Sequence, residues 1–479
     1  MSHKTKWLLG IIAVLLIAVG IFLWYYLFRT VPEKQYGSLR DHFLYASIGT
    51  EGLEGTPYWI WVILPKVFPE YLPGPGGYAS LGLNWEPGHE LPMGVTTKTI
   101  GYRRTGLNCA FCHVSQVRRT ADQAQPDFYP GGPSHQFRVQ DYQQFLFRSA
   151  ADPRFNASVL MHEIESITNL SPGEKFVYRF LLIPGTKKAL LQQRDEFEWQ
   201  KTRPLQGPGR VDPFNPVRFR IFKQPDDGSV GNADIPSIWN QADRVGTSIH
   251  WDGLSKKFAE VAISSAIGDG ARDQYLDTAS LNRVGEFVHD LKAPAYPLPV
   301  DHALAARGEP IYKAQCAACH ALGGARTGTV VPVAEAGTDQ HRADSWTQGQ
   351  VDDWKKMAAD YKSKYDATWN LDTFSKNNGY VTNLLDGVWL RGPYLHNGSV
   401  PNLRALLEPE ANRPKVFFRG NDVVDPKNVG FISDVPSANG RGFFRYDTAL
   451  PGNGNQGHLW GTTLSAADKE ALLEYMKTL

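Results

Sequence analysis

Two short motifs in the chain combine a pair of thiols with an imidazole at a spacing that suits covalent attachment of a porphyrin. They use all four cysteines of the chain, as Cys109-Ala110-Phe111-Cys112-His113 and Cys316-Ala317-Ala318-Cys319-His320. Two thiols separated by two residues can form thioethers with the two vinyl groups of one haem, and the histidine that follows can ligate the iron. We therefore expect two covalently bound haem c groups, with His113 and His320 as iron ligands.

Two other readings of these motifs fit less well. Zinc ribbons pair C-x-x-C units about 15–20 residues apart, whereas these two units are separated by roughly 200 residues. A redox dithiol or disulfide does not need a histidine directly after it, and here both motifs have one. Haem c is attached outside the cytoplasm, so the motifs also predict an exported protein.

The amino terminus carries a candidate membrane segment. Residues 7–28 contain no charged side chain, and Lys4 and Lys6 precede them while Arg29 follows. Such a run is long enough to cross a hydrocarbon core of about 30 Å. We expect residues 1–31 to be a single-pass anchor in the inner (cytoplasmic) membrane, with the haem domains in the periplasm or outside the cell. The alternative is a cleaved signal peptide, but the run exceeds the usual h-region and no small-x-small site follows it.

The remaining sequence is organised around the two motifs. A proline-rich stretch at residues 292–299 (KAPAYPLP) suggests a linker. A helix is expected just before it at 278–291, another just after it at 304–315, and a closing helix begins after Ser465 as N-cap. We predict a mainly α fold with two tandem cytochrome-c-like haem domains, at 32–298 and 299–479, that carry long loop insertions and follow one transmembrane helix. The apolar residues 58–68 are expected in the core or on the membrane surface.

Net charge excludes one class of partner. The chain has 50 Lys and Arg residues against 49 Asp and Glu residues, so it offers no basic excess for nucleic acid. We expect no nucleic acid binding.

A short sequence pattern occurs in both halves of the chain. The turn Trp251-Asp252-Gly253 is followed five residues after its glycine by Phe258, and His396-Asn397-Gly398 is followed five residues after its glycine by Leu403. Each pattern predicts a tight turn that leads into an amphipathic helix. In this register Trp251 occupies the position that His396 has in the second half.

These motifs together carry a family resemblance. Two C-x-x-C-H motifs, a Trp-Asp-Gly turn between them and residues 393–399 (PYLHNGS) resemble the bacterial di-haem cytochrome c peroxidase superfamily. That superfamily includes the enzyme that matures methylamine dehydrogenase and the rubber-oxygenase-like proteins. Residues 101–109 (GYRRTGLNC) and 236–240 (PSIWN) are most similar to the latter branch. The resemblance covers roughly residues 100–479 by the order of their motifs.

The resemblance implies a division of labour between the haems. The amino-terminal haem would be the reactive one, and the carboxy-terminal haem would be six-coordinate and pass electrons. Trp251 would relay charge between them, and His396 would be the sixth ligand of the second iron, with Met357 as its rival in that domain. A calcium ion near the domain boundary is a further analogy, for which the sequence shows no ligand cluster.

Each of these residues could instead have a purely structural role. His396 could be a turn residue that bonds to backbone, and Trp251 could be a packed core aromatic. His250 is a candidate wall of the haem cleft. His135 is either a sixth ligand of the first haem or a histidine in a surface loop, and the surface loop is favoured.

The chain departs from the peroxidases where peroxide would be cleaved. The peroxidase pattern places a glutamine ten residues after the tryptophan and a glutamate about twenty after it; these positions are Val261 and Ala271 here. Asp269 is near and could substitute for the glutamate.

Two functions therefore stay open. The favoured one is an oxidoreductase whose first haem binds a small-molecule oxidant, O2 or peroxide. The alternative is a pure electron carrier with both irons six-coordinate. In either case we expect a redox partner, which is a quinol-linked complex or a small cytochrome or cupredoxin.

Overall fold

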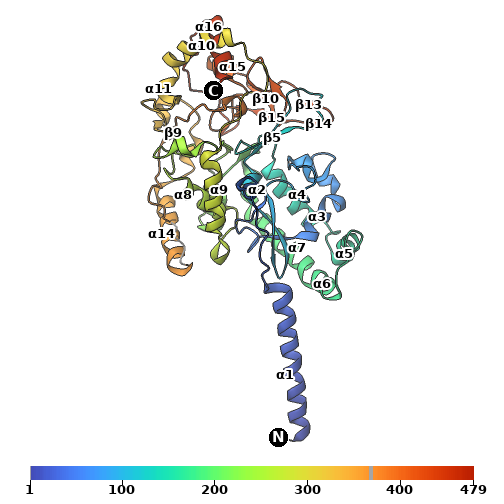
Figure 1. Cartoon of the computed structure of the whole chain (residues 1–479). Helices are drawn as coiled ribbons and strands as arrows, with labels where there is room; N and C mark the ends of the chain where they lie inside the picture. The colour runs from blue at the N-terminus through green and yellow to red at the C-terminus, as the bar shows by residue number, and fades with distance from the viewer. Residues whose placement is uncertain (1, 366–369) are drawn as a thin grey trace.

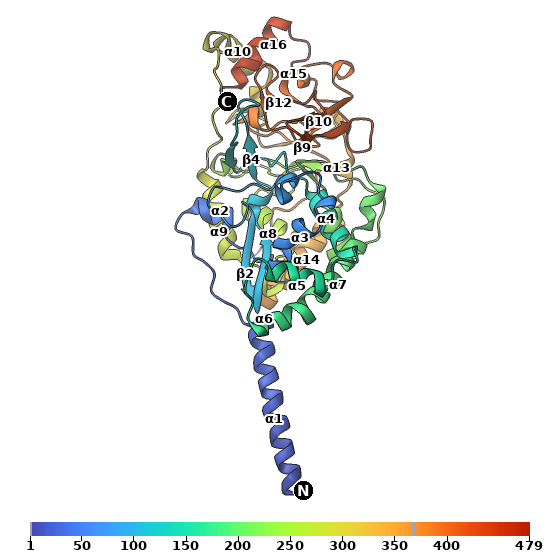
Figure 2. The same cartoon turned by 90° about the vertical axis from the view of Figure 1, so that its right-hand side faces the viewer.

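A single long helix projects from the body of the molecule, and the two halves of the chain follow one another away from it (Figure 1). The computed structural model describes residues 2–365 and 370–479. The first half of the chain lies next to the projecting helix, and the carboxy-terminal helix lies at the opposite end of the body (Figures 1 and 2).

Helices dominate the architecture, as predicted. Those of the first half are α1 (His3–Leu23), which continues into the π-turn η1 (Trp24–Phe28), α2 (Leu39–Tyr45), α3 (Tyr58–Val67), α4 (Val139–Ala151), α5 (Ala157–Glu165), α6 (Pro172–Val177), the π-turn η5 (Tyr178–Leu182), α7 (Ile183–Glu196), α8 (Phe258–Gly268) and α9 (Thr278–Asp290). Those of the second half are α10 (His302–Gln315), α11 (Ala317–His320), α12 (Val333–Ala336), α13 (His341–Asp344), α14 (Gln348–Tyr365), α15 (Leu403–Leu406) and α16 (Ala466–Met476).

Short antiparallel strands occupy the insertions between the helices. A three-stranded sheet has the order β1-β3-β2 and contains β1 (Thr56–Pro57), β2 (Val95–Ile100) and β3 (Tyr102–Leu107). The remaining strands form two-stranded pairs: β4 (Val114–Val117) with β5 (Asp127–Pro130), β6 (Arg210–Val211) with β7 (Ala233–Asp234), β8 (Val330–Pro332) with β9 (Gly379–Val381), β10 (Val416–Arg419) with β15 (Phe444–Asp447), β11 (Val424–Asp425) with β12 (Gly430–Phe431), and β13 (Ser437–Ala438) with β14 (Arg441–Gly442).

The two helices predicted to flank the second motif pack directly on each other. Helix α16 begins at its expected N-cap, where the Ser465 hydroxyl accepts a hydrogen bond from the Asp468 amide. Gly308 of α10 lies against the backbone of Ala471, and a Cβ atom at residue 308 would stand 2.0 Å from the Ala471 carbonyl oxygen. The absent side chain lets the two helices approach closely and close the second haem region.

A second helix pair flanks the first motif. In it α2 packs against α9, with the rings of Phe43 and Phe287 5.0 Å apart. The predicted helix at 278–291 is therefore confirmed, and it has the same closing position in its half that α16 has in the other. The predicted domain boundary at 298/299 lies between α9 and α10 and stays a prediction.

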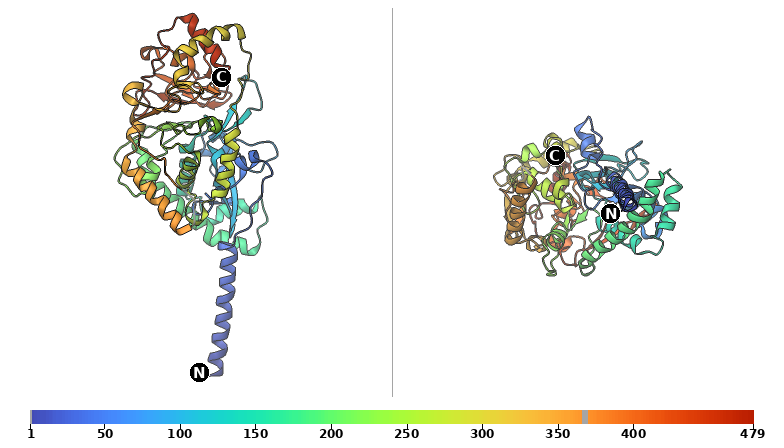
Figure 3. Two further views of the ribbon diagram at one scale, coloured as in Figure 1. Left: turned by 60° about the vertical axis from the view of Figure 1, so that its left-hand side comes forward. Right: turned by 90° about the horizontal axis from the view of Figure 1, so that it is seen from below.

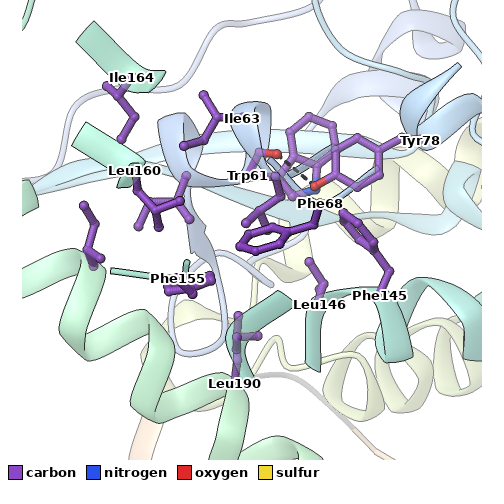
Figure 4. Close-up of a cluster of buried hydrophobic side chains, with 14 of the residues drawn as sticks. Trp61, Ile63, Phe68, Tyr78, Phe145, Leu146, Phe155, Leu160, Ile164 and Leu190 are labelled. Carbon is purple, nitrogen blue, oxygen red and sulfur yellow. Dashed lines mark hydrogen bonds between the residues drawn. The ribbon is translucent and has the colours of Figure 1, made fainter. Parts of the chain in front are cut away.

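The largest apolar cluster of the first half is built on α3 (Figure 4). Trp61 stacks on Tyr78 at 4.3 Å between ring centres, and the Tyr78 hydroxyl donates to the Trp61 carbonyl at 2.8 Å. Helix α3 thus buries the apolar run at 58–68, so that the core reading of this run is confirmed. Its burial anchors the insertion between α2 and the first haem motif.

One helix from the second half of the chain packs on the first half. In Figure 1, α14 lies low in the body beside α8. Trp346 and Trp354 belong to one apolar cluster with Phe214, Leu254 and Ile263 of the first half. The insertion that follows the second haem motif therefore helps to cover the first haem region.

The end of the amino-terminal helix is integrated into the body. Val31 donates its amide to the carbonyl of Thr99 at 3.1 Å, and Thr30 forms a β-bridge with Ile100. Gly101, at φ +74°, lies against the backbone of Leu27, where a side chain would clash. Among the described residues one helical stretch, His3–Phe28, is long and apolar enough to cross a membrane, and it is either a signal sequence or an anchor.

Candidate haem sites

Both C-x-x-C-H motifs adopt the same local conformation. The amide of His113 donates to the carbonyl of Cys109 at 3.0 Å, and the amide of His320 donates to the carbonyl of Cys316 at 3.0 Å. Each motif thus forms one helical turn that brings its two thiols and its imidazole to the same side of the backbone. All four cysteines are half-buried and none forms a disulfide, so their thiols are available for thioether bonds.

A backbone carbonyl orients each motif imidazole. The Nδ1 atom of His113 donates to the Pro236 carbonyl at 3.0 Å, and the Nδ1 atom of His320 donates to the Asn383 carbonyl at 2.6 Å. Ligating histidines commonly donate their second ring nitrogen in this way, which fixes the tautomer and leaves Nε2 for the metal. Burial lowers the pKa of His113 to about 4 and also lowers the pKa of His320, so both rings are neutral and able to bind iron.

The first motif opens into a large internal cavity. Cys109, Cys112 and His113 line a space of about 400 Å³ that also contacts α4, α7, α8 and α14. Its size is in the range of cofactor pockets. Burial raises the pKa of the Cys109 thiol to about 12, so the unattached sulfur is a neutral thiol in an apolar wall. The thiol pair, the oriented imidazole and the cavity together fit a covalently bound haem.

Helix α8 supplies one wall of this cavity. Phe258, Val261, Ala262 and Ser265 line it, with spacings that place them on one helical face. Of the two positions that the peroxidase pattern would use, Val261 lies in this wall. Ala271, the other, is fully buried and is not part of the lining.

Asp269 adds an acid to the same wall. It follows α8 by one residue and lines the cavity, near Glu54 and Arg220. Burial and the negative charge of Glu54 raise the pKa of Asp269 to about 7. Arg220 does not neutralise Asp269, because it bonds to Glu54 at 3.0 Å and to Glu196 at 2.8 Å. The cavity wall thus includes a carboxyl group whose pKa is raised to about 7.

A histidine that the sequence analysis did not single out faces the second motif. The ring centres of His320 and His458 are 6.2 Å apart. Metal–imidazole bonds of about 2 Å on both faces of one ion separate the ring centres by roughly 6 Å. The Nδ1 atom of His458 is buried and has no hydrogen-bond partner among the described residues. Burial, together with nearby His320, lowers the pKa of His458 to about 4.

His396, the ligand expected from the resemblance, has a different environment. Its ring stacks on Tyr380 at 3.8 Å between centres, and its Nε2 atom is buried without a partner among the described residues. Burial and the neighbouring cations Arg342 and Arg210 keep its pKa well below the ordinary value. Its carbonyl accepts the Asp234 amide at 2.8 Å.

The two other candidate ligands lie away from an axial position. Met357 is on α14, in the apolar cluster beside the first cavity and not beside the second motif. His135 is buried, contrary to the surface-loop reading, and both of its ring nitrogens face carbonyl oxygens, those of Pro133 and Gln116, at 3.1 Å.

Trp251 links the backbone segments that hold the two motif histidines. Its Nε1 atom donates to the carbonyl of Asp234 at 2.6 Å, two residues before Pro236, which holds His113. On its other side, its carbonyl accepts the amide of Val381 at 2.9 Å.

The second segment completes this connection. Val381 lies two residues before Asn383, whose carbonyl holds His320. A continuous chain of peptide and hydrogen bonds therefore runs from the imidazole of His113 through Trp251 to the imidazole of His320.

His250, beside this tryptophan, lines the first cavity as the sequence analysis expected of a cleft wall. Its backbone has φ +71°, an unusual value for a residue with a side chain. Its Nδ1 atom lies 2.8 Å from a carboxylate oxygen of Asp252 and 3.0 Å from a guanidinium nitrogen of Arg342, and these contacts fix the ring. Calcium has less support, because the described residues include no cluster of three or more His, Cys, Asp or Glu side chains suited to a metal ion.

Comparison with known proteins supports the haem assignment. Residues 379–418 match the family described as RoxA-like, cytochrome c-like, and residues 303–368 match the family described as cytochrome c oxidase, cbb3-type, subunit III. The uncharacterized protein y4iM of Sinorhizobium fredii is 31% identical over 51% of this chain and 64% of its own length. The uncharacterized protein y4iJ of the same organism is 24% identical over 78% of this chain and 76% of its own length.

The chain thus contains cytochrome c-like domains, including a RoxA-like cytochrome c domain. Its two cysteine pairs are consistent with two covalently bound haem c groups, and domains of this type function in electron transfer. They also indicate a location outside the cytoplasm.

Proposed function

We propose that the chain is a membrane-anchored di-haem oxidoreductase of the periplasm, related to the di-haem cytochrome c peroxidase superfamily. Its first haem has an open position for O2 or peroxide, and its second haem is six-coordinate and transfers electrons. The observation that supports this proposal is the difference between the two haem sites. An imidazole stands 6.2 Å from His320, whereas the α8 wall of the first cavity is largely apolar.

At the first site Cys109, Cys112 and His113 would hold the haem, which would supply a binding position for a small oxidant. Pro236 fixes the imidazole of His113 from behind. Val261 puts an apolar side chain into the α8 wall at the position where the peroxidase pattern has a glutamine. This favours dioxygen over peroxide, because cleavage of peroxide needs a group that moves a proton between its oxygens. Asp269 is the one acid of this wall that could do so.

At the second site His320 and His458 would together hold the haem iron. Two neutral imidazoles give a low-spin iron that is saturated and suited to electron transfer. In this assignment His396 has a positioning role, since its carbonyl holds Asp234, and Asp234 in turn accepts the indole hydrogen bond of Trp251.

Trp251 is the proposed relay between the haems. Its hydrogen bonds attach it to both segments that orient the motif imidazoles, and an indole side chain is readily oxidised. If Trp251 were only a packed core aromatic, its two hydrogen bonds would not need to end on the two segments that orient the motif histidines.

The amino-terminal helix is proposed to stay attached as the anchor. Gly101 lies against the backbone of Leu27, and a Cβ atom at Gly173 would stand 2.2 Å from the Tyr26 hydroxyl oxygen. The surface of the body therefore fits closely around the end of the helix. A signal sequence that is removed after export would not need such a fit. An anchored protein would exchange electrons with a quinol-linked membrane complex or with a small cytochrome or cupredoxin.

Electron paramagnetic resonance of the oxidised, haem-loaded protein tests the proposal. We expect one high-spin and one low-spin ferric signal, and carbon monoxide binding to one haem after reduction. Two low-spin signals without carbon monoxide binding would support the pure electron carrier instead, with His250 as a candidate second ligand because it lines the first cavity. The intact mass of the mature protein tests the anchor, since retention leaves residues 7–28 in place.

A further inference from the structure

A group of exposed apolar side chains lies next to the end of the amino-terminal helix. Phe176, Phe180 and Leu181 expose 49%, 58% and 38% of their surfaces, although they belong to one continuous helical stretch formed by α6 and η5. We call these three residues the α6 patch. The same stretch also buries Val177, Tyr178 and Leu182 in the core. Apolar side chains that stay exposed together on a helix whose other apolar residues are buried indicate a second apolar environment outside the core.

The α6 patch is in contact with the proposed anchor. The rings of Phe22 and Phe176 are 5.9 Å apart and meet edge to face, and those of Phe176 and Phe180 are 5.0 Å apart. Figure 2 shows α6 at the point where α1 enters the body, and Figure 3 shows from below that the body extends to the side of α1. The patch and the anchor therefore form one continuous apolar surface.

The contact between Phe22 and Phe176 fixes the depth of the α6 patch in the bilayer. Phe22 lies within the uncharged run at 7–28, six residues before its end. At 1.5 Å per residue it lies about 9 Å below Phe28 along the helix axis. If the run spans the bilayer, Phe176 must lie at the same level as Phe22. Interfacial helices bury their apolar face about 5–10 Å into the boundary between headgroups and acyl chains, which is the same depth.

The charges around the patch suit a lipid headgroup layer. Arg179 is exposed between Phe176 and Phe180 in sequence and has no ion-pair partner among the described residues. Lys175, on the same stretch, pairs only loosely with Glu165, at 3.5 Å. Cations at the edge of an apolar face attract the phosphates of phospholipids.

We propose that the α6 patch inserts into the outer leaflet of the membrane that holds the anchor, and so seats the first haem domain on the bilayer. The inference rests on the proposed retention of the anchor. The occupant of the patch is the lipid itself, because the contact with Phe22 places the patch at the depth of the bilayer interface. The amino-terminal helix and the α6 patch would then hold the body in a fixed orientation, with the first haem domain next to the membrane and the second away from it.

Photo-crosslinking of the full, haem-loaded chain tests this inference. Benzoylphenylalanine is placed at Phe180, at Leu16 of the anchor, or at Leu450, an exposed residue of the second half. Each protein is reconstituted into vesicles of phosphatidylethanolamine and phosphatidylglycerol, irradiated and analysed for lipid adducts by mass. We expect the Leu16 and Phe180 positions to capture lipid, at about ten times the yield of the Leu450 position.

The outcomes separate the two proposals. Capture at position 16 with no more capture at 180 than at 450 would overturn membrane seating and leave the anchor intact. A mature protein whose mass lacks residues 7–28 would overturn the anchor itself. As a second variant, Phe176→Ser in the chain labelled at 180 should lower lipid capture several-fold with unchanged haem content. The matched change Val416→Ser, at an exposed residue of the second half, should not.

Discussion

The imidazole rings of His320 and His458 lie with their centres 6.2 Å apart and their planes tilted by 45°. One ring belongs to the second haem motif, and the other lies shortly before the closing helix α16. No comparable imidazole pair is found at the first motif among the described residues, where His250 lines the cavity but is held by Asp252. This difference between the sites underlies the proposed division of labour.

Replacement of His458 by alanine should convert one low-spin haem to high spin, because the second iron loses a strong axial ligand. The measurement is electron paramagnetic resonance of the oxidised protein, with covalent haem content as a check on folding. The matched variant is His396→Ala, which removes the other candidate ligand. Conversion in His396→Ala together with an unchanged spectrum in His458→Ala would return the ligand to His396.

Replacement of Trp251 by phenylalanine should slow electron exchange between the haems. Phenylalanine keeps an aromatic ring but loses the Nε1–H that donates to Asp234 at 2.6 Å. The rate can be followed by flash photolysis of the partly reduced, carbon monoxide-bound protein. Trp85→Phe is the control, because Trp85 also donates its indole N–H to a carbonyl, that of Glu90, but on the exposed surface. Equal rates in the two variants would remove Trp251 from the path.

Asp269 should make stability depend on pH. Its pKa is raised from 3.8 to about 7 in the folded protein. Between these two values the folded state binds more protons than the unfolded state, so stability falls as pH rises through this window and is lowest above pH 7. Asp269→Asn should flatten this slope, as measured by chemical denaturation between pH 4 and pH 8. A slope identical to that of the parent protein would contradict the assignment.

Gly308→Ala should destabilise the second haem region. The new methyl group would stand 2.0 Å from the Ala471 carbonyl oxygen, so α10 and α16 must separate. The expected cost is about 1–3 kcal/mol in the free energy of unfolding. Gly185→Ala, also in a helix but with open space around it, should instead stabilise the protein by about 0.5–1 kcal/mol. Similar effects of the two changes would show that the helix contact is not close.

The sequence predicted those parts of the molecule that depend on local chemistry. The haem motifs, the Ser465 cap and the helices around residues 278–291 and 304–315 are encoded within a few residues, so spacing alone identifies them. The position of His458 could not be predicted in this way, because its relation to His320 depends on how the long insertion after the second motif returns to α16. A histidine in such an insertion carries no local signal of its role.

The sequence also did not predict that residues of the second half cover the first cavity, for a similar reason. Trp354 of α14 and Phe374, which line this cavity, lie far beyond the predicted boundary at residue 298. Periodicity shows that α14 is a helix with apolar positions, but it does not say which half of the chain those positions contact.

The crossing of α14 into the first half also makes completion of the first haem site depend on a distant part of the chain. Trp354 and Phe374 line the same cavity as Cys109 and Cys112, although they follow the second haem motif in the sequence. The wall around the first site is therefore complete only after this late segment of the polypeptide has folded over it.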